Sequence, residues 1–261
     1  MTYNVKNYAS IDAINFSRLK MMAKSPRHYR AYQRGAADTP SLRLGRAVHA
    51  LALRQEQEIA VWDGSRRAGA DWRKFAETHS DKTILSLAET DQARRIADSL
   101  APTMERFLTH SAVIERPLVW GWGKRRCKGI PDLHDRDVLV DLKTTQSVES
   151  RMFGNAAARY HYHAQLAWYQ EGIARATGHA PSDVYIVAVE TSAPYDTAVF
   201  RVTPEQLEAG WDMCQTWLDR LEECERTGDW PGQAPHETDL QLPAWAVGGD
   251  VELTIGGERV F

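Results

Sequence analysis

One short alternating segment, residues 138–143 (Val-Leu-Val-Asp-Leu-Lys), limits what this 261-residue chain can fold into more than any other feature. In an extended strand, successive side chains point to opposite faces, so Asp141 and Lys143 share one face while Val138, Val140 and Leu142 share the other. The aliphatic face has to pack against a core, which holds the polar face in a fixed direction. The segment therefore predicts a strand that presents an acid beside a cation.

Helical spacing dominates the first hundred residues. The segments that read as helices are 14–34, interrupted at the Ser25-Pro26 step, 41–55 and 89–108. Residues 60–80 are rich in Arg and Trp and have only weak periodicity. We therefore expect the N-terminal part of the chain to be mainly helical.

Strand signals follow, separated by turn-rich pieces. The three segments that read as strands are 113–120, 126–130 and 137–143, and we expect them to form an antiparallel meander. The later segments are predicted as a long helix over 150–177, strands over 184–189 and 198–202, a helix capped by Thr203, and a hairpin over 251–261. This order predicts an α/β (α+β) chain with a central mixed sheet flanked by helices.

Charge is segregated along the chain, although the formal net charge is only −3. Residues 13–55 carry nine Lys and Arg against the single acid Asp38, whereas residues 203–261 carry thirteen acids against three Arg. A basic N-terminal part would concentrate phosphate contacts on one face, but a solvated helix surface explains the same pattern equally well.

Composition excludes several classes of protein. No apolar run reaches the roughly 18–20 residues that span a bilayer, and the polar start lacks a secretory signal, so we expect a cytoplasmic chain with no membrane contact. Cys127, Cys214 and Cys224 are an odd number without C-x-x-C spacing, which implies neither a disulfide framework nor a zinc or iron–sulfur site.

A second carboxylate, Asp132, is expected on the neighbouring strand, beside Asp141. Two carboxylates are costly to bury together unless a cation neutralises them, and Mg²⁺ prefers oxygen ligands of this kind. Such a metal would polarise a phosphoryl oxygen and lower the pKa of a bound water, while Lys143 would orient that water or stabilise the developing charge. The alternative is an exposed hairpin whose Asp and Lys are merely solvated, because D-x-K alone is a weak signal.

Other candidate residues come in pairs at helical spacing. His49 lies four residues after Gly45, and Gln165 lies four before Tyr169, so each pair projects in a common direction. Glu115 lies in the first predicted strand. Taken singly, each of these side chains would pass as an ordinary packing or surface residue.

A basic cluster lies on or beside the strand that leads to Asp132, and it consists of Lys124, Arg125, Arg126 and Lys128. It is a candidate for holding DNA phosphates next to the metal, with a charge-protected edge strand as the alternative. Arg46 and Thr144 are further candidates for contacts with DNA.

These motifs occur in one order along the chain: Gly45-x-x-x-His49, Glu115, Gly129-Ile130-Pro131-Asp132, Asp141-Leu142-Lys143-Thr144-Thr145 and Gln165-x-x-x-Tyr169. The order resembles that of RecB-type PD-(D/E)XK nucleases. The opening and the tail resemble more narrowly the RecE (exodeoxyribonuclease VIII) branch of phages and prophages, through Ile14-Asn15-Phe16-Ser17-Arg18-Leu19, Ser25-Pro26-Arg27-His28-Tyr29, Trp230-Pro231-Gly232 and Leu242-Pro243-Ala244-Trp245.

The resemblance implies roles for these residues. His49, Asp132, Asp141 and the main-chain carbonyl of Leu142 would bind Mg²⁺, with Mn²⁺ as a substitute, and Lys143 would be catalytic. Glu115 would assist the metal or its water. Gln165 and Tyr169 would lie beside the site and touch the DNA strand.

The resemblance also implies a restriction-endonuclease-like core in a single domain over 1–261. Residues 1–110 would be the mainly helical, DNA-facing part, 111–227 the catalytic core and 228–261 an irregular tail with a hairpin. Family members digest linear duplex DNA from the 5′ end, and their 3′ single-stranded tails serve a single-strand annealing recombinase (RecT-like). Similar enzymes assemble as homo-oligomeric rings.

Two other functions fit the same residues. One is a structure- or site-specific DNA endonuclease, because the fold serves both activities. The other is a catalytically silent DNA-binding module, against which the intact Asp132, Asp141 and Lys143 argue.

Overall fold

The computed structural model describes residues 8–32, 38–234, 236–243 and 246, together with the backbone of 253–255 and 258–260. Its centre is a five-stranded sheet in the order β10-β9-β8-β7-β4. The strands are β4 (Val113–Ile114), β7 (Leu133–His134), β8 (Val138–Thr145), β9 (Asp183–Glu190) and β10 (Thr197–Val202). Only β8 and β9 run parallel, so the sheet is mixed, as expected.

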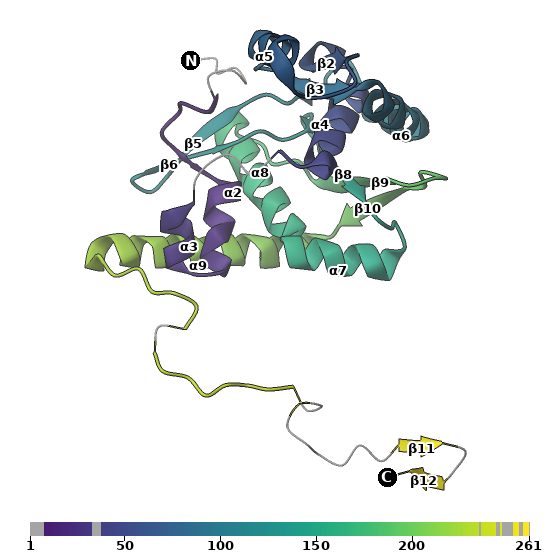
Figure 1. Cartoon of the computed structure of the whole chain (residues 1–261). Helices are drawn as coiled ribbons and strands as arrows, with labels where there is room; N and C mark the ends of the chain where they lie inside the picture. Colours follow the sequence, from purple (N-terminus) through teal and green to yellow (C-terminus); the bar gives the residue numbers. More distant parts are fainter. Residues whose placement is uncertain are drawn as a thin grey trace.

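Helices cover both faces of this sheet (Figure 1). Val140 and Leu142 of β8 pack on one face with α4 (Pro40–Ala52) and α6 (Leu87–Glu105). Leu139 packs on the other face with α8 (Tyr162–Thr177) and α9 (Pro204–Thr227). The parallel strands β8 and β9 are buried on both faces, which requires aliphatic residues on both faces of β8. The predicted alternation, with Val140 and Leu142 on the face opposite Asp141, is confirmed.

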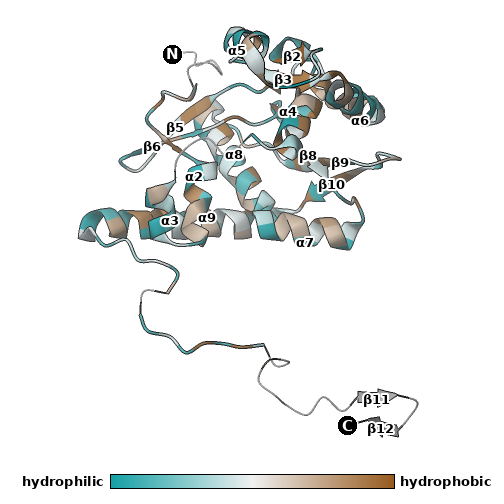
Figure 2. Cartoon of the chain, viewed as in Figure 1, coloured by the Kyte–Doolittle hydropathy of each residue, from teal (hydrophilic) through white to brown (hydrophobic). Residues whose placement is uncertain are grey.

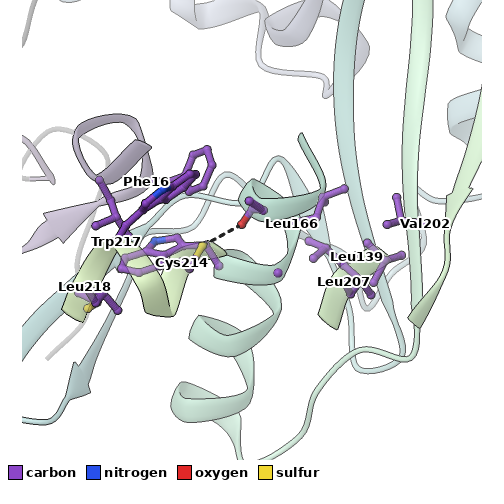
Figure 3. Packing of buried hydrophobic residues seen from close by; sticks show 14 of the residues in the cluster. Phe16, Leu139, Leu166, Val202, Leu207, Cys214, Trp217 and Leu218 are labelled. Atoms are coloured by element: carbon purple, nitrogen blue, oxygen red, sulfur yellow. Dashed lines mark hydrogen bonds between the residues drawn. The ribbon is translucent and has the colours of Figure 1, made fainter. Parts of the chain in front are cut away.

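The larger core cluster joins α8, α9 and the first short helices (Figure 3). Cys214 of α9 donates a hydrogen bond to the main-chain oxygen of Ala164 in α8 at 3.5 Å, and Trp217 packs against Phe16. The three cysteines are buried free thiols, as expected from their spacing. Hydrophobic and hydrophilic residues both occur along α6 and α9, as the colours in Figure 2 show.

Close backbone contact between α8 and α9 depends on Gly210. A Cβ at this position would lie 2.6 Å from the main-chain oxygen of His163 and 2.8 Å from Cα of Ala164, both backbone atoms that cannot move aside. Gly210→Ala is expected to lower the free energy of unfolding by about 1–3 kcal/mol. Gly154→Ala is the matched control, because its Cβ meets nothing within 4 Å, and it should stabilise by about 0.5–1 kcal/mol. Equal melting temperatures for the two variants would contradict this contact.

The predicted three-stranded meander is wrong. Residues 113–120 divide between β4 and β5 (Leu118–Trp122), and β5 pairs with β6 (Arg125–Gly129) in a separate three-stranded sheet whose order is β1-β6-β5. β8 pairs with β7 instead. Two prolines explain the division, because Pro117 and Pro131 lack the N–H that would continue a ladder.

The helix expected over 14–34 is also different in the structure. Ile14–Asn15 form β1, which pairs in parallel with β6, and α2 (Phe16–Leu19) begins after it. The break at Ser25-Pro26 is confirmed, since Ser25 caps α3 (Pro26–Ala31). A 3₁₀ helix, η1 (Lys20–Ala23), lies between α2 and α3.

The weakly periodic region 60–80 holds regular structure. β2 (Ile59–Trp62) pairs in parallel with β3 (Thr83–Ser86), and α5 (Gly69–Thr78) lies between them in the sequence. A 3₁₀ helix, η2 (Glu56–Glu58), precedes β2. The first hundred residues are therefore mainly helical but not exclusively so.

The prediction of a single long helix over 150–177 is wrong, because the helix is interrupted at one residue. His161 has φ 60° and ψ 43°, the left-handed conformation, and it separates α7 (Ser150–Tyr160) from α8. Its ring lies edge-on against Trp217 at 5.4 Å between centroids. The break changes the direction of the chain and brings Tyr160 and Tyr162 together.

The C-terminal part begins as predicted. Thr203 caps α9 through a capping box with Gln206. After α9, the ring of Trp230 stacks on Tyr29 and the main-chain oxygen of Pro231 accepts a hydrogen bond from the N–H of Arg27. The predicted hairpin is present as β11 (Leu253–Ile255) and β12 (Glu258–Val260), and its Gly256-Gly257 turn lies outside the described residues.

No helix in the described part of the chain combines the length and the apolar character that a bilayer span requires.

Candidate active site

The candidate active site is centred on the polar face of β8. Lys143 Nζ lies 2.5 Å from Oδ2 of Asp141, so the acid and the cation predicted from the alternation are adjacent. Asp141 is only 1% exposed. Lys143 Nζ also donates a hydrogen bond to Oε1 of Gln165 at 3.3 Å and lies 4.8 Å above the ring of Tyr162.

The two charges perturb each other strongly. Burial raises the pKa of Asp141 to about 6, while Lys143 opposes that rise and Asp132 adds to it. Burial by itself would lower the pKa of Lys143, but the charges of Asp141 and Asp132 raise it above its ordinary value. In the absence of a metal, Lys143 is therefore held as an ammonium by the carboxylates beside it.

Asp141 depends on Lys143 for charge compensation. Both of its carboxylate oxygens are buried, and among the described residues the contact that reaches them is the ion pair with Lys143. A buried carboxylate in this state is expensive unless a further positive charge reaches it. The observation favours a cation beside Asp141.

Asp132 is held opposite Asp141 by main-chain pairing. It immediately precedes β7, whose Leu133 pairs with Val140 of β8, and its Oδ2 accepts a hydrogen bond from the N–H of Leu142 at 2.7 Å. The N–H and C=O of one strand residue point to the same side. The carbonyl of Leu142 therefore points toward Asp132, as its predicted role as a ligand requires.

His49 reaches the same place from α4. The helix packs closely on β8 at Gly45, where a Cβ would lie 3.4 Å from Oγ1 of Thr144. Nδ1 of His49 lies 3.5 Å from Oδ2 of Asp132. The Gly45-x-x-x-His49 spacing thus has a packing role at its first residue, and its second residue faces the site.

Glu115 was expected inside a strand and lies just after β4. It has φ 42°, and its N–H donates to the main-chain oxygen of Asp132 at 3.0 Å. Burial raises the pKa of Glu115, and the charge of Asp132 raises it further. The strained turn directs this third acid toward the same space as Asp132 and His49.

One ligand atom from each of His49, Glu115 and Asp132 lies within 4.8 Å of the others. This donor set suits a hard divalent cation, because it combines two carboxylates with an imidazole and adjoins the donor-poor carboxylate of Asp141. The set differs from the predicted one in that Glu115 belongs to the cluster, whereas the close contact of Asp141 is with Lys143. These residues fit a metal ion.

Gln165 and Tyr169 extend a chain of contacts from Lys143. Nε2 of Gln165 donates to the hydroxyl of Tyr169 at 3.0 Å, and burial raises the pKa of Tyr169 well above its usual value, so that hydroxyl stays neutral. A Cβ at Gly129 would lie 2.9 Å from the Tyr169 ring. The pair is placed to orient Lys143, and its contact with a DNA strand stays a prediction.

The basic cluster does not act as one surface. Lys128 is buried and its ammonium donates to the main-chain oxygens of Tyr8 and Ile11, so the expectation that it holds DNA phosphates is wrong. Arg125 forms an ion pair with Glu225 of α9 at 2.6 Å. Lys124 lies in the turn of the β5–β6 hairpin, which points away from β8 in Figure 1.

Arg126 is exposed on the same hairpin, and its role in DNA binding, like that of Lys124, stays a prediction. Arg46 is about half exposed and pairs with Asp38. It lines the hollow of about 410 Å³ at the active site, which His49, Glu115 and Lys143 also line. Thr144 lines the same hollow.

Two residues near Lys143 were missed from the sequence. Tyr162 contacts Lys143 and lines the hollow, and it was missed because the predicted helix ran straight through the break at His161. Lys20 lies close enough for the charge of Lys143 to add to the lowering of its pKa by burial. The only sequence signal for Lys20 was the excess of basic residues over 13–55.

The PD-(D/E)XK class is defined by a mixed sheet flanked by helices that carries an acid, a second acid and a lysine. Here Asp141 and Lys143 lie on the central strand β8, and Asp132 lies just before the neighbouring strand β7. Residues 15–237 match the family described as "PDDEXK-like domain of unknown function (DUF3799)", and the chain belongs to this family. The predicted superfamily and fold class are thereby confirmed. The narrower likeness to the RecE branch stays a prediction.

The chain is also similar to proteins of known structure. The chain is similar to a "Putative exonuclease" from Eubacterium rectale, with a TM-score of 0.65 and 13% identity over 96% of this chain and 100% of that chain. The structure of SSO0001 has a TM-score of 0.30 and 11% identity over 75% of this chain and 84% of that chain, which is too distant to support an argument. The first likeness shows the fold alone. None of the curated proteins searched matches.

Metal affinity is expected to depend on pH through Asp141. Its pKa of about 6 means that protonation below pH 6 removes a negative charge from beside the metal ligands. The affinity for Mn²⁺, measured by calorimetry, should therefore be highest above pH 6 and fall by up to about tenfold per pH unit below it. Asp141→Asn should be weaker above pH 6 and lose this part of the dependence. An affinity that is constant from pH 5 to pH 7 would contradict the assignment.

Proposed function

We propose that this chain is a metal-dependent nuclease that hydrolyses phosphodiester bonds of double-stranded DNA. The observation that carries the proposal is the buried, donor-poor carboxylate of Asp141, which adjoins both Lys143 and the His49–Glu115–Asp132 cluster. A structural ion pair needs no third acid and no histidine around it. A metal-dependent phosphoryl-transfer site uses such a cluster to hold its cation beside the reacting phosphate.

A divalent cation bound by these residues, Mg²⁺ or Mn²⁺, would supply polarisation of a phosphoryl oxygen and a bound water of lowered pKa. Lys143 then places an ammonium where negative charge develops on the phosphate. Gln165 fixes Nζ of Lys143 through a hydrogen bond, and the neutral hydroxyl of Tyr169 fixes Gln165 in turn. Gln165 and Tyr169 of α8 thus orient the ammonium of Lys143 before substrate binds.

We assign the activity to an exonuclease acting from the 5′ end of linear duplex DNA in the cytoplasm. The support is the resemblance of the opening and tail motifs to the RecE branch, together with the name of the similar protein from Eubacterium rectale. The 3′ single-stranded tails would serve a RecT-like annealing recombinase. A homo-oligomeric ring around the duplex would keep the enzyme on its substrate.

The test is release of nucleotides from linear duplex DNA labelled separately at the 5′ and 3′ ends, beside a covalently closed circle of the same sequence. Early release of the 5′ label with an intact circle is expected. Early release of the 3′ label would overturn the polarity. Cutting of the circle would instead assign an endonuclease, and tight binding without release would assign a silent DNA-binding module.

A further inference from the structure

A second hollow adjoins the active site and has no role in the proposed chemistry. This hollow, the α7 groove, has a volume of about 590 Å³. One wall is a face of α7, on which Met152, Asn155, Ala156 and Arg159 follow one another at helical spacing. The other wall includes Gln92 of α6, and the floor is the end of β8 with the turn after it.

The α7 groove is continuous with the hollow at the active site. Ser41, Thr144 and Tyr162 line both spaces. Thr144 directly follows Lys143 in β8, and Tyr162 lies under the ammonium of Lys143. A polymer with one phosphate at Lys143 would therefore pass its neighbouring units into the α7 groove.

The lining of the groove suits an anion that also carries hydrogen-bonding groups. No Asp or Glu is among the described residues that line it, although the chain has 35 acids. Gln92, Gln146 and Asn155 offer amides, and Arg159 offers a cation. A guanidinium at the edge of an amide-lined groove is a common arrangement for holding phosphates beside bases.

An aromatic ring at the edge of the groove remains accessible. Tyr160 is 50% exposed, and its ring stacks on Tyr162 with 5.8 Å between centroids and 25° between planes. The break at His161 produces this stack, since Tyr160 ends α7 and Tyr162 begins α8. Exposed aromatic faces beside cations are the usual platform for unpaired bases, whose own faces are free to stack.

We propose that the α7 groove binds unpaired nucleotides of the strand being cut, with a base stacked on Tyr160 and a phosphate paired with Arg159. This inference rests on the proposed function and adds a binding site for single-stranded DNA to it. In a duplex, both faces of each base are covered by its neighbours, so Tyr160 selects unpaired bases. The groove volume of about 590 Å³ suits a short segment of single strand.

Binding is measured by fluorescence anisotropy in EDTA, so that hydrolysis does not compete, with a single-stranded oligonucleotide and a blunt duplex as probes. Tyr160→Ala and Arg159→Ala are each expected to weaken single-strand binding by about tenfold and leave duplex binding within about twofold. Tyr160→Phe keeps the ring and should bind as the wild type does. Arg220→Ala, an exposed arginine of α9, is the matched control and should change neither affinity.

An abasic oligonucleotide separates stacking from charge. Removing bases should weaken binding to the wild type but not to Tyr160→Ala, while Arg159→Ala keeps its sensitivity to the missing base. The groove assignment is overturned if the wild type does not bind the single strand, if Tyr160→Ala and Arg159→Ala bind it normally, or if both lose single-strand and duplex binding equally. Melting curves confirm that each variant is folded.

The two proposals fail differently. A wild type that hydrolyses no DNA in Mg²⁺ overturns the proposed function and leaves a measured loss of single-strand binding in Tyr160→Ala standing. An active wild type with unchanged single-strand binding in Tyr160→Ala overturns the groove alone.

Discussion

Lys143→Ala is expected to lower the rate of phosphodiester hydrolysis by about 10²- to 10⁴-fold. The ammonium of Lys143 is the cation on β8 that contacts Asp141 directly, and Gln165 holds it in place. Arg220→Ala, which removes an exposed cation of α9, is the control and should retain the wild-type rate. Initial rates on labelled linear duplex DNA measure the difference.

The same substitution should also destabilise the protein. Removing Lys143 leaves the buried Asp141 without its cation, and breaking a buried pair in this way costs about 3–5 kcal/mol. Asp141→Asn/Lys143→Met removes both charges and should recover most of the melting temperature while remaining inactive. If Lys143→Ala keeps the wild-type rate, or if the double variant is active, Lys143 has no part in catalysis.

Asp132→Asn is expected to reduce metal affinity by at least about 100-fold and to abolish hydrolysis. The amide oxygen of Asn still accepts the hydrogen bond from Leu142, so the fold is preserved while the charge that faces His49 and Glu115 is lost. Calorimetric titration with Mn²⁺ measures the affinity directly. Asp219→Asn, which changes an exposed acid of α9, should bind metal as the wild type does.

Thermal melting gives an independent readout for Asp132. A metal that binds the folded chain at ten times its dissociation constant stabilises it by about 1.4 kcal/mol, which is a few degrees of melting temperature for a chain of this size. The wild type should show this rise on addition of Mg²⁺ and Asp132→Asn should not. An equal rise in both proteins would place the metal elsewhere.

The features that could be predicted from the sequence are those set by local chemistry. The two faces of β8 follow from its period of two, and the start of α9 follows from Thr203 with Pro204 after it. The adjacency of Asp141 and Lys143 could be predicted because a strand fixes the direction of its side chains, whereas Asp132 lies just before β7 and not within it. Their neighbours His49, Gln165 and Tyr169 required a family resemblance, because helical spacing alone cannot say which strand a helix covers.

The features that could not be predicted depend on pairing between distant segments. Pro117 and Pro131 separate strands that are neighbours in the sequence. As a result β6 does not pair with β8, and it pairs with β1, which lies more than a hundred residues earlier in the chain. Lys128 reads as part of a basic cluster, but β1 and the residues before it cover its side chain. The left-handed His161 could not be predicted either, because a single histidine within a helical pattern does not mark a break.

The central claim is that His49, Glu115, Asp132 and Asp141 hold a metal with which Lys143 cleaves DNA. Its most direct test is hydrolysis of linear duplex DNA by the purified chain in EDTA, in Mg²⁺ and in Mn²⁺, beside Asp132→Asn under the same conditions. We expect hydrolysis by the wild type in either metal, none in EDTA and none by Asp132→Asn. Hydrolysis that persists in EDTA, or an Asp132→Asn variant as active as the wild type, would contradict the claim.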